Sequence, residues 1–94
     1  MAVTVVVAYD ISEDLRRARA AATIQRVGDR IQRSVYLCAA DSPELDELMT
    51  RLLDVIDPDT DSVYMLHQCL ACWDKVRVLG QATVEPPALY WGVL

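Results

Sequence analysis

Phenylalanine is absent from this sequence, and histidine occurs only once, at His67. A hydrophobic core must therefore be built mainly from valine, leucine, isoleucine and alanine. A lone histidine without a plausible neighbouring nucleophile pair argues against Ser-His or Cys-His catalysis. Only three glycines occur in 94 residues, and no glycine-rich ligand loop is present.

A basic leader and a long apolar run are also missing. Residues 1 to 9, MAVTVVVAY, have no basic flank and are followed by an acid, unlike a secretory signal. No stretch approaches the roughly 18 apolar residues that a membrane span requires. The three cysteines, Cys38, Cys69 and Cys72, are an odd number, which favours reduced thiols. We therefore expect one cytoplasmic domain with no membrane segment.

Positive charge is scarce overall, but it is concentrated in one region. The net charge is −5, yet residues 16 to 33 contain six arginines and one acid, a local charge of +5. The remaining residues contain three basic and thirteen acidic side chains, a charge of −10. A local basic region can bind phosphate, because salt screens distant acids beyond about 8–10 Å. Charge alone leaves an ordinary solvated helix face as the open alternative.

The hydrophobic pattern predicts the order β, α, β, α, β. Residues 3 to 9 are rich in β-branched side chains, and residues 12 to 27 have a helical period that stops at Gly28. Residues 30 to 38 read as a strand with a bulge near Arg33-Ser34, although residues 29 to 40 could supply two short strands. A helix capped by Ser42 follows, then a strand at residues 62 to 68 with a short extension at residues 76 to 79.

This order predicts a ferredoxin-like βαββαβ sandwich over residues 1 to 80. The segment at residues 81 to 94 ends in the apolar sequence ALYWGVL. Such a segment needs a surface to cover it, so we expect it to dock on a partner subunit as an added strand. Packing on its own chain is the alternative.

The helix predicted at residues 12 to 27 has two distinct faces. Ala20, Ala21 and Ile24 share the apolar face, and the opposite face includes Arg16, Arg19 and Arg26. Arginines in a row can contact backbone phosphates without reading the base sequence. Arg17 lies nearer the apolar face and is placed to turn back towards Asp10.

Asp10 has two interpretations. Asp10-Ile11-Ser12-Glu13 resembles a capping box, which would make Asp10 the N-cap of the helix. As a metal ligand, one carboxylate is a poor site, whereas two copies across a dimer axis could share Mg²⁺ with substrate phosphates. The metal interpretation therefore requires a homodimer.

A cluster of acids and a pair of cysteines could each suggest a metal site, but we favour a structural role for both. The segment from Asp57 to Asp61 lacks the glycine and closing glutamate of a calcium loop, so we interpret it as a solvated turn. Cys69 and Cys72 could bind zinc only if Cys38 or His67 came close to them, and ordinary reduced thiols are the favoured alternative.

The ordered set of motifs resembles the Cas2 family of small CRISPR-associated proteins. Tyr9-Asp10-Ile11 closes the first strand, Arg16-Arg17 lie just inside the helix, and Gly28 to Tyr36 reads GDRIQRSVY. The segment Asp61 to Tyr64, the Cys69 and Cys72 pair and Leu79-Gly80 also fit. Two departures are Tyr36, where phenylalanine is usual in the family, and Leu37, where an acid is common.

The resemblance implies a ferredoxin-like homodimer that joins the CRISPR integrase and holds duplex DNA during spacer acquisition. It further implies metal-dependent endonuclease activity on RNA or DNA in some members. A toxin-like ribonuclease and a small-molecule regulatory domain stay open as alternatives, because fold does not fix function. The candidate residues are Asp10 and Ser34 for catalysis, Asp10 for Mg²⁺, and Tyr9, Arg16, Arg17, Arg19, Arg26, Arg30, Arg33 and Tyr36 for nucleic-acid binding.

Overall fold

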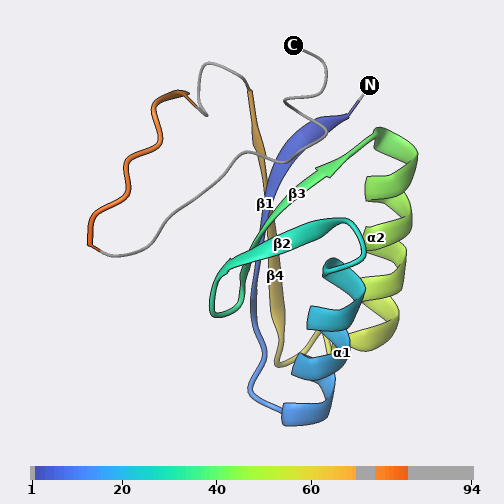
Figure 1. Cartoon of the computed structure of the whole chain (residues 1–94). Coiled ribbons are helices and arrows are strands. Elements are labelled where there is room, and N and C mark those ends of the chain that lie inside the picture. Colours follow the sequence, from blue (N-terminus) through green and yellow to red (C-terminus); the bar gives the residue numbers. More distant parts are fainter. Residues whose placement is uncertain (1, 70–73, 81–94) are drawn as a thin grey trace.

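The computed structural model describes residues 2–69 and 74–80 of the chain. Four strands and two helices alternate in the order expected for a ferredoxin-like fold (Figure 1). The elements are β1 (Val3–Asp10), α1 (Asp14–Ile24), β2 (Gly28–Gln32), β3 (Val35–Ala40), α2 (Ser42–Val55) and β4 (Ser62–Gln68). The predicted fold class is confirmed.

The sheet is antiparallel with the strand order β2-β3-β1-β4, and both helices cover one of its faces (Figure 1). Odd-numbered residues of β1, such as Val5 and Val7, are fully buried against the helices, where they meet Ile24 of α1 and Leu48 of α2. Even-numbered residues of β1 lie on the opposite, helix-free face, because side chains alternate along a strand. The strand is therefore the central element that separates the two faces.

Helix α1 begins later than the sequence pattern predicts, and Asp10 does not cap it. The N-cap is Glu13, whose carboxylate accepts hydrogen bonds from the backbone N–H groups of Leu15 and Arg16. Asp10 is instead the last residue of β1, and its register partner is Ser62 of β4. The capping interpretation of Asp10 is wrong, because two residues, Ile11 and Ser12, separate the end of the strand from the cap.

The region between the helices forms a hairpin of two strands, as the second reading of residues 29 to 40 predicted. Arg33 and Ser34 form the turn, and Ser34 has a positive φ of 65°. Gly28 is the first residue of β2 and not the residue that ends α1. A side chain at Gly28 would collide with Cys38 and with the carbonyl oxygen of Leu37 on β3. Close strand packing, and not a left-handed helix end, explains this glycine.

Helix α2 is fixed at its start by a complete capping box. Asp41, and not the predicted Ser42, is the N-cap, and it exchanges hydrogen bonds of 2.9 Å in each direction with Glu44. The buried residues of α2 are Leu45, Leu48 and Leu52. The helix leads through the turn at residues 57 to 61 into β4, which lies at one edge of the sheet beside β1.

Several predictions concern the C-terminal part of the chain. Residues 76 to 79 form no strand in the described part of the chain, so the predicted extension there is wrong. The predicted docking segment at residues 81 to 94 lies outside the described residues, as does Cys72. No helix within the described residues is both long and apolar enough to cross a bilayer.

Candidate nucleic-acid interface

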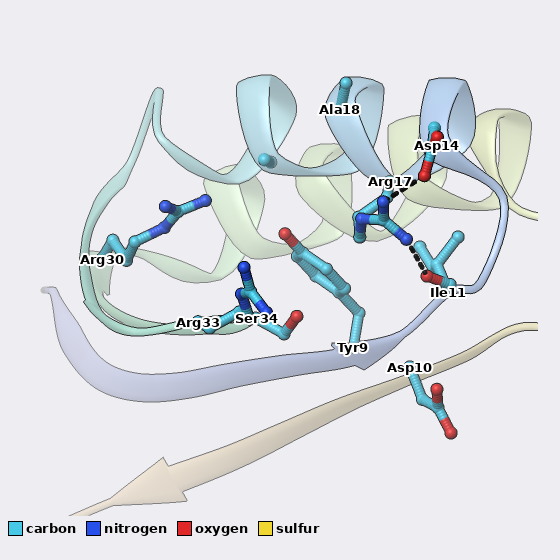
Figure 2. Close-up of a pocket in the computed structure, with 10 residues that line it drawn as sticks. Tyr9, Asp10, Ile11, Asp14, Arg17, Ala18, Arg30, Arg33 and Ser34 are labelled. Carbon is cyan, nitrogen blue, oxygen red and sulfur yellow. Dashed lines mark hydrogen bonds and ion pairs between the residues drawn. The ribbon is translucent and has the colours of Figure 1, made fainter.

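Tyr9 and Asp10 are neighbours in sequence but lie on opposite faces of the sheet. Figure 2 shows the Tyr9 ring directed towards α1 and the Asp10 carboxylate directed away from it. Tyr9 is buried and belongs to the hydrophobic core, whereas Asp10 is exposed. The two candidate residues therefore cannot contact the same atom of a ligand from one copy of the chain.

Tyr9, Tyr36 and Arg30 form a connected polar cluster under α1. The hydroxyl groups of Tyr9 and Tyr36 are 3.3 Å apart, and the two rings stack with centroids separated by 5.9 Å. Nη2 of Arg30 donates to the Tyr36 hydroxyl at 3.3 Å, and the guanidinium lies over the Tyr36 ring. Burial raises the pKa of Tyr9 above its usual value, and the hydrogen bond with Tyr36 adds to the rise. Both rings are too buried to stack on a nucleotide base.

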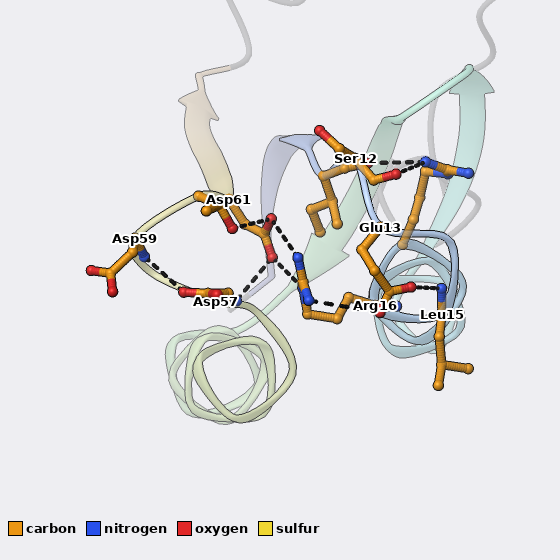
Figure 3. Close-up of polar contacts among 10 residues, drawn as sticks. Ser12, Glu13, Leu15, Arg16, Asp57, Asp59 and Asp61 are labelled. Atoms are coloured by element: carbon orange, nitrogen blue, oxygen red, sulfur yellow. Dashed lines mark hydrogen bonds and ion pairs between the residues drawn. The ribbon is translucent and has the colours of Figure 1, made fainter.

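Arg16 is held against the turn between α2 and β4 by an acid that is distant in the sequence (Figure 3). Its Nε donates to Oδ2 of Asp61 at 2.8 Å, and its Nη2 donates to Oδ1 of Asp61 at 3.4 Å. The Asp61 side chain is 1% exposed. It also accepts a hydrogen bond of 2.8 Å from the backbone N–H of Asp57. The hydrogen bond from Arg16, followed by the one from Asp57, lowers the pKa of Asp61.

The position of Asp61 changes two interpretations made from the sequence. Asp61 is a buried ion-pair partner, so the reading of residues 57 to 61 as a fully solvated turn is wrong for this residue. Arg16 does not point outward in a row with Arg19, because its guanidinium faces the α2–β4 turn. No local pattern could predict this pair, since 45 residues separate its members.

Arg17 turns back towards the start of α1, as its place on the helix suggested, but its partners differ from the predicted one. Its Nη1 donates to the carbonyl oxygens of Ile11 at 3.1 Å and Ser12 at 3.0 Å. Its Nη2 forms an ion pair with Asp14. Arg17 thereby braces the connection between β1 and α1, and the Asp10 carboxylate points elsewhere (Figure 2).

Three arginines keep their charged groups available for a ligand. The side chains of Arg19, Arg26 and Arg33 make no hydrogen bond or ion pair within residues 2–69 and 74–80. Arg19 and Arg26 are exposed on α1 and just beyond it, and Arg33 is exposed on the hairpin turn. Of the predicted phosphate-binding residues, these three are the least committed to internal contacts.

Ser34 occupies the turn between β2 and β3 beside this charged region. Its carbonyl oxygen accepts a hydrogen bond of 3.0 Å from the backbone N–H of Tyr9. This bond fixes the hairpin turn to the end of β1 and places Ser34 at the rim of a cleft (Figure 2). Ser34 and Asp10 are thus close in the backbone, although the Asp10 carboxylate points away.

The helix-free face of the sheet carries an apolar strip that the sequence pattern did not single out. The β1–β4 register places Leu66 beside Val6 and Tyr64 beside Ala8. Tyr64 and Leu66 are each 56% exposed. Ser62 lies beside Asp10 at the end of the same strip. The sequence did contain a signal for this strip. Tyrosine and leucine occupy even-numbered positions of residues 62 to 68, where a solvent-exposed face of a strand would normally have polar residues.

Asp10 offers hard carboxylate oxygens at an exposed position, which is the kind of donor that Mg²⁺ accepts. Within the described residues, no three histidine, cysteine, aspartate or glutamate side chains come together as a metal-binding group. One Asp10 can supply one ligand, and the strip beside it would bring a partner's Asp10 close if two copies met on this face. The donor set therefore fits the predicted shared Mg²⁺ only in a dimer.

The cysteines give little support to the zinc alternative. Cys38 and His67 both have Val5 as register partner, on opposite sides, so they are two strand spacings apart, or about 10 Å. Cys38 is fully buried, and burial raises the pKa of its thiol to about 11. A neutral buried thiol is unsuited to metal binding, because the ligand form is the thiolate.

Comparison with known proteins agrees with this fold and these motifs. The profile of the family described as CRISPR associated protein Cas2 matches residues 1–76. The chain is 34% identical over 83 residues to a CRISPR-associated endoribonuclease Cas2 of Chloroflexus aurantiacus, covering 86% of this chain and 89% of that protein. It is 37% identical over 74 residues to a CRISPR-associated endonuclease Cas2 of Thermus thermophilus, covering 79% and 78% of the two chains.

The fold is also that of a solved member of the same family. The structure of Streptococcus pyogenes Cas2 at pH 6.5 superposes with a TM-score of 0.75 and 28% sequence identity, covering 82% of this chain and 99% of that one. The antiparallel four-stranded sheet, the motifs around Tyr9-Asp10 and the match over residues 1–76 lead to one conclusion: the chain belongs to the Cas2 family of CRISPR-associated proteins.

Proposed function

We propose that two copies of this chain form a symmetric dimer that binds duplex DNA and joins the CRISPR integrase during spacer acquisition. The observation that carries the proposal is the set of exposed guanidinium groups of Arg19, Arg26 and Arg33, which have no ion-pair partner among the described residues. Contacts of this kind neutralise backbone phosphates and need no base sequence. Membership of the family supplies the CRISPR context.

The apolar strip supports the dimer. Tyr64 and Leu66 expose large apolar surfaces beside Val6 and Ala8, on the face that the helices leave bare. Contiguous exposed apolar surface is unfavourable in water and commonly marks an interface. A second copy packed on this strip by a two-fold axis would cover it and place two Asp10 residues near each other.

The dimer and the integrase contact can be tested by the mass of the native particle, measured with and without the integrase. We expect a dimer alone and a larger complex with the integrase. Tyr64→Glu combined with Leu66→Glu should give a folded monomer, because it places charges in the proposed interface. A monomeric wild-type chain, or a failure to join the integrase, would contradict the proposal.

The DNA contact can be tested through its salt dependence. Each phosphate contact contributes about 0.9 to the slope of log affinity against log salt concentration. Arg19→Gln combined with Arg26→Gln should therefore lower the slope by about 1.8. The matched control is Arg51→Gln, since Arg51 is an exposed arginine on α2 that pairs with Glu47. An unchanged slope in the double variant would refute the assignment.

A second function is Mg²⁺-dependent endonuclease activity, and it rests on the names of two relatives and on the exposure of Asp10. Asp10 and the partner's Asp10 would hold the ion, and Mg²⁺ bound there would activate water for in-line attack on a phosphodiester. Cleavage of RNA and DNA should depend on Mg²⁺ and disappear in Asp10→Asn. The control is Asp54→Asn, an exposed acid on α2. Cleavage that survives in Asp10→Asn would exclude this site.

A further inference from the structure

A cleft of about 590 Å³ lies between α1 and the β2–β3 hairpin, on the helix side of the sheet (Figure 2). Its volume falls within the range of about 300–1,000 Å³ that is usual for small-ligand sites. Arg17 enters from α1, Arg30 from β2 and Arg33 from the hairpin turn, and Tyr9 forms the base. Charged groups from three separate segments therefore converge on one concave space.

The cleft keeps a net positive charge after its internal pairs are counted. Asp14 is committed to the ion pair with Arg17. Asp10 contributes to the lining, but its carboxylate points to the other side of the sheet (Figure 2). Arg30 and Arg33 are then the uncompensated charges, and Arg33 has no polar partner among the described residues. An anion would balance these two guanidinium groups.

The directions of the hydrogen bonds at the base of the cleft make the Tyr9 hydroxyl a candidate donor to a bound anion. Arg30 can only donate, so the Tyr36 hydroxyl oxygen accepts from Nη2 of Arg30. Tyr36 is fully buried, and the acceptor for its hydroxyl hydrogen among the described residues is the Tyr9 oxygen, 3.3 Å away. Tyr36 must therefore donate to Tyr9, because a buried donor left unpaired is costly. The Tyr9 hydroxyl also has the Ser34 side chain as a hydrogen-bond partner. A ligand oxygen in the cleft, where Figure 2 shows that hydroxyl, would share its hydrogen with Ser34.

We propose that this cleft binds a phosphate monoester, with Arg30 and Arg33 as charge partners and the Tyr9 hydroxyl as a hydrogen-bond donor. A monoester carries a charge of about −1.5 to −2 at pH 7 and has three terminal oxygens, whereas a backbone diester carries one charge. A row of exposed arginines suits a continuous backbone, and a concave site with converging donors suits one terminal group. The source favoured by the proposed DNA-binding function, on which this part rests, is the 5′-phosphate at a strand end.

The test compares the affinity of the full-length protein for two short duplexes that differ only in a 5′-phosphate or a 5′-hydroxyl group. We expect the phosphorylated duplex to bind about tenfold more tightly, as hydrogen bonds to charged groups allow. Arg33→Gln and Tyr9→Phe should each bring the ratio close to one. The control Arg19→Gln should weaken both duplexes equally and leave the ratio unchanged, because Arg19 does not line the cleft.

The source of the phosphate is distinguished by a titration with inorganic phosphate, followed by NMR at the backbone N–H of Ser34. Binding of inorganic phosphate that disappears in Arg33→Gln supports the site. If the protein binds inorganic phosphate in this way but binds neither duplex, the proposed DNA function fails and the monoester site stands. Equal affinity for both duplexes together with no response to inorganic phosphate would overturn the inference. A preference that persists in both Arg33→Gln and Tyr9→Phe would overturn its location.

Discussion

Gly28 gives the sharpest test of how the hairpin is built. An ideal Cβ at this position would lie 2.6 Å from the carbonyl oxygen of Leu37 and 2.9 Å from Cα of Cys38, with Sγ of Cys38 closer still. Ordinary contacts are about 3.5–4.0 Å, so β2 would have to move away from β3 by roughly 1 Å in Gly28→Ala. Overpacking of this kind costs about 1–3 kcal/mol.

The predicted loss can be measured by urea unfolding followed by far-UV circular dichroism. For a domain of this size, each kcal/mol lowers Tm by about 4–8 °C, so heating gives a second readout. The double variant Gly28→Ala, Cys38→Ala should lose less free energy of unfolding than the two single variants lose in sum. The expected difference, the coupling energy between the two sites, is about 0.5–1.5 kcal/mol. Recovery should be incomplete, because the Leu37 carbonyl remains in place.

Two results would refute this account of Gly28. The first is a Gly28→Ala variant within about 0.5 kcal/mol of the wild type, the range of ordinary surface substitutions. The second is a Gly28→Asn variant more stable than Gly28→Ala. Asparagine tolerates a left-handed helix end better than alanine does, but it would fill the crowded space beside Cys38 more fully.

The remaining predictions concern an ion pair, a turn and a thiol. The lowered pKa of Asp61 means that its stabilising contribution is complete above the unfolded value of about 3.9 and is lost as pH falls through the lower folded value. Urea midpoints measured from pH 6 to pH 2 should show a smaller acid-induced decrease in Asp61→Asn than in the wild type. Ser34→Gly should keep or raise stability, because glycine accepts a φ of 65°, whereas Ser34→Val should cost about 1–3 kcal/mol in the same unfolding assay. Cys38, buried and with a pKa raised to about 11, should resist iodoacetamide at pH 8 in the native protein and react in urea, as measured by the mass of its peptide.

The sequence was most informative where one face of an element is buried. The β-branched run of β1 and the leucines of α2 predict their elements because burial imposes a regular period on both. The caps were assigned wrongly, because Asp10 and Glu13 both have the right chemistry and the end of β1 decides between them. Arg16 and Asp61 could not be paired, since their contact exists only after α2 and its turn are placed.

Some features of the candidate site could likewise be predicted from the sequence, and others required the tertiary structure. The cluster of arginines was visible as local charge, and their separation into paired and unpaired groups required the tertiary structure. Arg16 and Arg17 have internal partners, while Arg19 has none among the described residues. The sequence also indicated a bulge or bend near Arg33-Ser34, where the structure has a turn, but the concave space that these residues border depends on how the hairpin folds beside α1.

The alternation of β1 at its last two residues has an evolutionary consequence. Tyr9 and Asp10 are encoded by adjacent codons, yet one belongs to the cleft under α1 and the other to the bare face of the sheet. A substitution at either position leaves the chemistry of the other face intact. A lineage could therefore lose the proposed metal ligand at position 10 by a single mutation and keep the proposed anion-binding cleft under continued selection. The proposed binding and cleavage activities could then change by separate mutations, although their residues share one strand.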